Sequence, residues 1–101
     1  MNANFFGKQY KVVPLDDIGI RDYGLYYDDA ISLIRTVAKN KKRILGGDII
    51  LRMNGRWFMS NDSWYSTKGT PEGTLQDALC FLEKYKKQTD GEWVVCVVIE
   101  N

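Results

Sequence analysis

Histidine is absent from this sequence of 101 residues, and cysteine and proline occur only twice each. Without histidine the chain lacks the commonest general base, the Ser-His and Cys-His nucleophile systems, and the commonest ligand of transition metals. Two cysteines form no zinc site without histidine or further thiolates. The acidic pairs Asp16-Asp17 and Asp28-Asp29 are sequence neighbours, whose side chains project to different sides of a strand or helix. We therefore expect no catalytic residue, no cofactor and no bound metal, and an interaction protein rather than an enzyme.

Long apolar runs and targeting signals are also missing. The longest apolar run is the seven residues from Trp93 to Ile99, whereas a membrane span needs about 20. The first eight residues contain no basic region followed by an apolar stretch, so we predict no signal peptide. Cys80 and Cys96 lie among apolar neighbours, and both are predicted to be buried free thiols. The expectation is a cytoplasmic protein with no membrane partner.

The composition is that of one globular domain. Hydrophobic residues make up 45% of the chain, and the 27% of charged residues do not indicate a disordered tail. A chain of this length usually forms a single domain. We predict one domain over residues 1–101, in which residues 1–14 carry the weakest pattern.

Two stretches show the apolar spacing of amphipathic helices. In the first, from Asp28 to about Asn40, apolar residues recur at spacings of three and four. For the second, Thr74 is the predicted N-cap and Asp77 occupies the capping-box position. A cluster of lysines followed by Asp90-Gly91 marks its C-terminal end.

Asn54-Gly55 stands between two apolar, β-prone runs and predicts a type I′ hairpin turn, because both central residues need a positive φ. Gly46-Gly47 are expected to break the chain before the first strand. A two-residue loop fixes the register of the ribbon. The predicted pairs are Met53 with Arg56, Leu51 with Phe58 and Ile49 with Ser60 on one face, and Arg52 with Trp57, Ile50 with Met59 and Asp48 with Asn61 on the other. We expect the helices to cover the first face.

The final strand, Trp93 to Ile99, is apolar at every position. Such a strand lies in the middle of a sheet or has one face buried by a partner. Together these elements predict an α+β fold, with an antiparallel β-sheet of three to five strands and about two α-helices packed on one face.

The first candidate for function is a predicted connection of 13 residues between the hairpin and the second helix, Asn61 to Gly73. Loops of this length are usually functional or disordered. This one carries Trp64 and Tyr65, and aromatic residues beside polar ones are typical of binding hot spots. The alternative is that Trp64 folds back onto the sheet as part of the core.

The second candidate is a separation of charge that the near-neutral total conceals. Residues 15–32 hold five aspartates against one arginine, a local net charge of −4, together with three tyrosines. Residues 35–43 hold five basic residues and no acidic one, a local net charge of +5. An acidic, tyrosine-rich surface suits a basic nucleic-acid-processing partner, since carboxylates can occupy the place of phosphates. The alternative for both stretches is a solvated helix end that complements the helix dipole.

The third candidate is the outer face of the hairpin, with Ile50, Arg52, Trp57 and Met59. If helices cover only the other side, this patch is exposed apolar surface, which usually marks an interface. The alternative for Arg52 and Trp57 is a simple cation–π pair across the strands.

Four short motifs carry a family resemblance. They are Ile18-Gly19-Ile20-Arg21 with Leu25, Asp29-Ala30 at the start of a helix, Ile44-Leu45-Gly46-Gly47-Asp48 at a strand, and Asp62-Ser63-Trp64-Tyr65. Together they resemble the immunity protein 40 family, small cytoplasmic proteins of bacterial polymorphic-toxin and contact-dependent growth inhibition systems. The resemblance covers about residues 15–99. Tyr26-Tyr27 departs from it, because a small polar residue is expected before the helix.

The resemblance implies a protein that neutralises a cognate secreted toxin by binding it, without chemistry. Many toxins of such systems are nucleases, so the expected partner is a ribonuclease or another nuclease, bound 1:1 by a chain that is a monomer when free. Acidic and aromatic residues are the expected contacts: Asp16, Asp17, Asp22, Tyr23, Tyr26, Tyr27, Asp28, Asp48, Asp62, Trp64 and Tyr65. Of these, Asp48, Trp64 and Tyr65 fall on the family's motifs.

Two other functions compete with this hypothesis. One is a small nucleic-acid-binding regulator that uses the basic residues Arg35, Lys39, Lys41, Lys42 and Arg43. The other is a small enzyme, or a structural homodimer that associates through the outer face of the hairpin.

Overall fold

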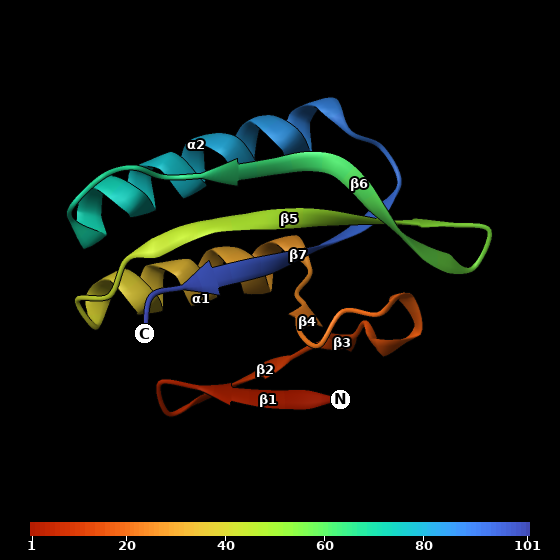
Figure 1. Cartoon of the computed structure of the whole chain (residues 1–101), viewed down its shortest axis with the longest axis horizontal. Coiled ribbons are helices and arrows are strands. Elements are labelled where there is room, and N and C mark those ends of the chain that lie inside the picture. Colours follow the sequence, from red (N-terminus) through yellow and green to blue (C-terminus); the bar gives the residue numbers. More distant parts are fainter.

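The computed structural model describes all residues 1–101 as a three-stranded antiparallel sheet with two helices on one face (Figure 1). The elements in chain order are β1 (Asn2–Phe5), β2 (Lys8–Lys11), β3 (Val13–Pro14), the 3-10 helix η1 (Asp16–Ile18), β4 (Tyr23–Gly24), α1 (Tyr27–Lys39), β5 (Ile44–Met53), β6 (Arg56–Tyr65), α2 (Pro71–Gln88) and β7 (Glu92–Ile99). The main sheet has the order β6-β5-β7, and β1-β2 and β3-β4 form two small sheets. The predicted α+β architecture is confirmed.

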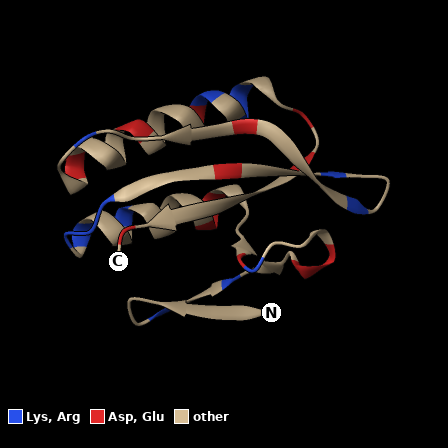
Figure 2. Ribbon diagram, viewed as in Figure 1, with Lys and Arg blue, Asp and Glu red and all other residues tan.

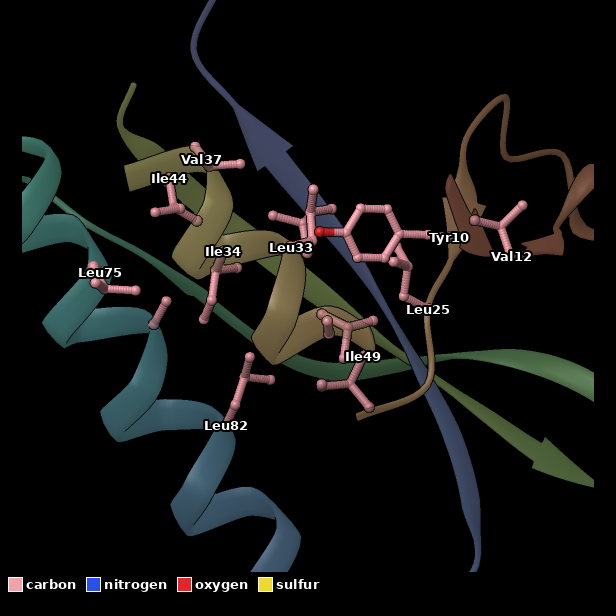
Figure 3. Packing of buried hydrophobic residues seen from close by; sticks show 14 of the residues in the cluster. Tyr10, Val12, Leu25, Leu33, Ile34, Val37, Ile44, Ile49, Leu75 and Leu82 are labelled. Atoms are coloured by element: carbon pink, nitrogen blue, oxygen red, sulfur yellow. The ribbon is translucent and has the colours of Figure 1, made fainter. Parts of the chain in front are cut away.

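The core lies between the main sheet and the two helices, which also pack against each other (Figure 3). In α1 the apolar positions predicted from spacing, Ala30, Leu33, Ile34 and Val37, are all buried. They meet Leu75, Ala78 and Leu82 of α2 and the inward-facing residues Ile44, Ile49, Trp93, Val95 and Val97 of the sheet. The helices therefore cover the predicted face of the hairpin at Ile49 and Leu51 but not at Met53 and Phe58, which are exposed.

The hairpin turn is confirmed, but its register changes part-way along the ribbon. Both turn residues have a positive φ, 51° at Asn54 and 78° at Gly55, as a type I′ turn requires. The predicted pairs hold from Met53–Arg56 to Ile50–Met59, after which Asp48 pairs with Ser63 instead of Asn61.

A bulge causes this change of register. The hydroxyl of Ser60 donates to the carbonyl of Ile49 at 2.6 Å and accepts from the N–H of Asp62 at 3.0 Å. The Ser60 side chain thus occupies the gap in the ladder, and the predicted pairs of Ile49 with Ser60 and Asp48 with Asn61 are wrong.

Two boundaries predicted from local signals are wrong. Gly46-Gly47 do not break the chain, because β5 already begins at Ile44. On the other strand, β6 continues through Tyr65, so the 13-residue loop shrinks to residues 66–70.

The second helix begins earlier than predicted. Its N-cap is Thr70, whose hydroxyl accepts the N–H of Gly73, and Pro71 follows at the first helical position. Thr74, the predicted N-cap, is instead fully buried inside the helix and accepts the N–H of Ile44 at 3.0 Å. Asp77 does not complete a capping box but accepts a hydrogen bond from Ser66.

The face of the sheet opposite the helices is partly covered by the chain's own N-terminal part. Leu15, between β3 and η1, packs with Ile50, Val94 and Cys96 into a second small core. The prediction that Ile50 belongs to an exposed patch is therefore wrong. The Arg52 guanidinium does lie over the Trp57 ring, 4.9 Å from its centroid, as the cation–π alternative predicts.

The apolar strand β7 is not central. It pairs with β5 on one side and makes a single bridge, Val95 with Leu25, on the other. Its two faces are buried because the helices cover one and the Leu15 segment covers the other. Of the two free cysteines, Cys96 in β7 is buried as predicted, whereas Cys80 on α2 is exposed.

The N-terminal hairpin β1–β2 packs beside α1. The Tyr10 ring is buried, and its hydroxyl lies 3.2 Å from the Thr36 hydroxyl and 3.4 Å from that of Ser32. Residues 1–14, whose sequence pattern is the weakest, thus form part of the same domain.

Candidate functional site

Several segments that are distant in sequence meet at one end of the molecule. Figure 1 shows the hairpin tip, η1, the start of α1 and the turn from α2 into β7 at this end, which we call the hairpin end. The end of α1 and the basic stretch after it lie at the opposite end. Figure 2 shows acidic residues in η1, at the start of α1 and before β7, and basic residues where α1 ends; basic residues also lie near the hairpin tip and in the last turns of α2. The two oppositely charged stretches predicted from the sequence therefore occupy opposite ends of the domain.

A cleft of about 840 Å³, the helix-end cleft, opens between the start of α1 and the turn from α2 into β7. Its lining residues are Tyr26, Tyr27, Asp28, Asp29, Lys86, Thr89, Asp90, Gly91, Glu92 and Trp93. Four of them are acidic and one is basic. The first turn of α1 carries no side-chain cap, and its two aspartates instead complement the positive end of the helix dipole.

Polar contacts tie the two walls of this cleft together. The Tyr26 hydroxyl donates a hydrogen bond to the Glu92 carboxylate, and this bond is the main reason why the pKa of Tyr26 is raised. On the other side, the Lys86 ammonium lies 4.2 Å from the centre of the Tyr27 ring. Burial raises the pKa of Tyr27, so both phenols are neutral hydrogen-bond donors at physiological pH. The cleft presents carboxylates, which bind basic side chains through charge-assisted hydrogen bonds.

The acidic residues of η1 lie toward the same end of the domain, but on the sheet face away from the helices. Asp16 and Asp17 are exposed on η1, which ends at Gly19 in the left-handed conformation. Asp22 is also exposed, and its carboxylate accepts the N–H of Tyr23 at 2.7 Å. These side chains make no ion pair, so their charges are free to act on a partner.

Asp48 and Tyr65 lie on a different surface, the face of the sheet away from the helices. They belong to a shallow hollow with Gly46, Ser63 and Val98, in which the Tyr65 side chain is 81% exposed. The Cys96 thiol is buried in this face of the sheet. Burial raises its pKa to about 12, and the carboxylates of Asp22 and Asp48 contribute in the same direction.

Asp62 and Trp64 point to the helix side of β6. The Trp64 ring stacks on Phe81 of α2 with 5.1 Å between centroids and lies against Gly47 of the neighbouring strand. Asp62 accepts a hydrogen bond from the Tyr85 hydroxyl at 3.0 Å. The structure therefore favours the alternative reading of Trp64, in which the ring packs onto the sheet.

The predicted contact residues thus fall into four groups: those in the cleft, the aspartates on and after η1 with the exposed Tyr23 of β4, the pair Asp48 and Tyr65, and the pair Asp62 and Trp64. Tyr26, Tyr27 and Asp28 share the helix-end cleft with residues that sequence reasoning missed, chiefly Asp90 and Glu92. In the sequence, Asp90-Gly91 indicates only the end of a helix. Nothing local reveals that Glu92 faces Tyr26 across 66 positions of chain.

Comparison with protein families identifies the chain. The model of the family described as Immunity protein 40 matches residues 14–99. The chain belongs to the immunity protein 40 family. No curated protein and no solved structure matches it.

Membership of an immunity protein family gives the chain an immunity function and a toxin as its partner. The range matched in this immunity protein contains both helices, the whole main sheet and all the predicted contact residues, whereas the β1–β2 hairpin lies outside it. No three Cys, Asp or Glu side chains gather in a way that could hold a metal ion. Neither helix is long and apolar enough to cross a membrane.

Proposed function

We propose that this immunity protein acts in the cytoplasm, where it neutralises a secreted nuclease toxin by binding at its hairpin end and covering the toxin's substrate-binding surface. The observation that carries the proposal is that an acidic, tyrosine-lined cleft and the acidic η1 lie at the same end of the domain, on the two faces of the main sheet. Residues 15–32 supply most of these charges, and Asp90 and Glu92 add two from the far end of the chain.

The physical argument rests on what a nuclease must do. An enzyme that binds a nucleic acid needs a basic cleft to hold phosphates. An inhibitor that presents carboxylates and neutral phenols can occupy the same donors, and its charge accelerates the encounter. A typical tight interface buries about 800 Å² on each partner, which is about one-eighth of the 6408 Å² surface of this domain. The hairpin end alone can supply that area in a 1:1 complex.

The rival function, nucleic-acid binding by residues 35–43, receives less support. Arg43 pairs with Glu100 at 3.0 Å, and Lys39 lies in the last turn of α1, where it complements the helix dipole. A gel shift at low salt tests this function separately, because phosphate contacts weaken steeply with added salt. A shift at micromolar protein would favour it over the toxin-binding proposal.

The test of the proposal first identifies the partner, by expressing the toxin domains encoded near this gene and selecting one that co-purifies with the chain. The double variant Asp17→Asn/Asp28→Asn removes two charges from the hairpin end. A matched control, Glu72→Gln/Asp77→Asn, removes two charges at the N-terminal end of α2. We expect the first to slow association with the toxin roughly three- to tenfold at low salt and to flatten its salt dependence, and the control to associate almost like the wild type. Equal effects of the two variants would overturn the proposal that the hairpin end is the contact.

A further inference from the structure

The tip of the β5–β6 hairpin carries exposed apolar side chains that the charged surface does not explain. Met53 is 52% exposed, Phe58 43% and Met59 57%. Met53 is exposed because β7 reaches only as far as Arg52, where it pairs through Glu92. Phe58 and Met59 lie on β6, the edge strand of the sheet, opposite Leu51 and Ile50. Figure 1 shows the tip projecting past both helices.

The tip of the hairpin is narrow. The two-residue turn at Asn54-Gly55 reverses the chain with two neighbouring strands only about 5 Å apart. Positive φ angles at both turn residues match the twist of the ribbon. A narrow, projecting tip with apolar side chains fits a concave surface, and the substrate clefts of enzymes are concave.

The chemistry of the tip is that of an interface anchor. Methionine, aromatic residues and arginine are enriched in the buried centre of protein interfaces. The tip has all three kinds, since Trp57 and Arg56 stand beside the methionines and Arg56 makes no ion pair. Buried centres of this kind are surrounded by polar residues that exclude water.

The tip is continuous with the acidic surface. A hollow of about 450 Å³ separates the hairpin from η1, and it is lined by Ile18, Trp57, Phe58, Met59, Arg56 and Gly55 together with Asp17. Asp17 therefore belongs both to the acidic surface and to the wall of the apolar hollow. A partner that is drawn to Asp17 meets Met59 in the same approach, while Met53 lies on the other face of the ribbon.

We infer that the hairpin tip is the apolar anchor of the toxin contact and inserts into an apolar pocket of the toxin beside its basic cleft, with the carboxylates of the hairpin end facing the cleft itself. This inference rests on the proposed function. It assigns different tasks to the two surfaces, because rim charges mainly set the association rate and its salt dependence, whereas a desolvated apolar anchor mainly sets the dissociation rate.

The experiment measures association and dissociation rates with the same neighbouring toxin domain. The variants are Met53→Ser and Met59→Ser, singly and together; both side chains are more than half exposed, so the fold is retained. The control is Phe6→Ser in the turn of the N-terminal hairpin, where Phe6 is 42% exposed. We expect the double variant to dissociate about tenfold faster or more, with association within about twofold of wild type and an unchanged salt slope. The control is expected to leave both rates unchanged.

Three other outcomes would overturn the inference, each for a different reason. If wild type binds the toxin and the double variant dissociates at the same rate, the tip is no anchor, while the proposed function stands. If wild type binds no toxin domain encoded near this gene, the proposed function fails and the inference fails with it. If wild type self-associates in sedimentation and the methionine variants abolish this, the tip is a contact between two copies and the assignment to the toxin is wrong.

Discussion

The Tyr26 hydroxyl, at the start of α1, donates a hydrogen bond to the carboxylate of Glu92, the first residue of β7. The contact joins the two walls of the helix-end cleft across 66 positions of sequence. It also fixes the Glu92 carboxylate at the rim, where it adds to the charge of Asp28 and Asp29. The same bond therefore stabilises the fold and shapes the surface that the toxin is proposed to meet.

Replacing Tyr26 by phenylalanine removes this bond and keeps the ring. We expect the free energy of unfolding to fall by about 1 kcal/mol at pH 7, since the bond has a charged acceptor but lies near solvent. The pKa of Tyr26 is raised in the folded state. The contribution is therefore complete below about pH 10, the ordinary phenol value, and is lost as the pH rises through the raised value. Urea unfolding at a series of pH values measures it.

The control for this variant is Tyr65→Phe, which removes a hydroxyl from a side chain that is 81% exposed and makes no hydrogen bond to the protein. We expect no measurable change at any pH. A difference between wild type and Tyr26→Phe that stays unchanged through the alkaline titration of the Tyr26 hydroxyl, followed by ultraviolet absorbance, would contradict the role assigned to the bond.

Thr74 is the second position where one hydroxyl connects two elements. Its side chain is fully buried, accepts the N–H of Ile44 at 3.0 Å and donates to the carbonyl of Pro71 at 2.8 Å. Thr74→Val has nearly the same shape but leaves the Ile44 N–H unpaired in the core, which costs about 1–3 kcal/mol. Thr67→Val, at an exposed position, should change the unfolding free energy by less than about 0.5 kcal/mol. Equal stabilities of the two variants would show that the Ile44 contact contributes nothing.

The features that the sequence predicts correctly depend on residues that lie close together in the chain. The α1 stripe and the Asn54-Gly55 turn depend on spacing and on backbone preference within a few positions, and both are confirmed. The wrong boundaries depend on distant partners. The polar stretch Asn61-Asp62-Ser63 continues β6, because the strand resumes its pairing with β5 at Ser63 beyond the bulge. Thr74 lies in the core, where its hydroxyl accepts the N–H of Ile44 from a distant part of the chain.

The candidate site shows the same division. Its acidic residues at positions 16–29 are readable as a cluster of charge, since they are close in sequence. The opposite wall, Asp90 to Trp93, is brought there only by the packing of α2 on α1 and the start of β7. The hairpin tip is predicted as a turn, but its exposure depends on where β7 and the helices end, which no local pattern states.

Substitutions at Trp64 test whether its ring serves to pack β6 against α2. Its ring stacks on Phe81, while its buried Nε1 has no hydrogen-bond partner in the protein. We therefore expect Trp64→Phe to cost less than about 1.5 kcal/mol, since the stacking is largely kept and no hydrogen bond is lost. Trp64→Ala should cost about 3 kcal/mol or more, because it leaves a cavity between β6 and α2. Toxin binding by folded Trp64→Phe should match the wild type, and a clear loss of affinity would restore Trp64 as a contact residue.

The two cysteines should differ sharply in reactivity, although their sequence surroundings look alike. Cys80 is exposed on α2, whereas Cys96 is buried in β7 and its pKa is raised to about 12. At pH 8 only about one Cys96 thiol in 10,000 is ionised, and the thiolate is the reactive form. A disulfide reagent at pH 8 should therefore modify one thiol of the native protein rapidly and the second only after unfolding in denaturant. Cys80→Ser should remove the rapid reaction and Cys96→Ser should keep it. Rapid modification of native Cys80→Ser would mean that β7 opens readily, which contradicts the burial of both its faces.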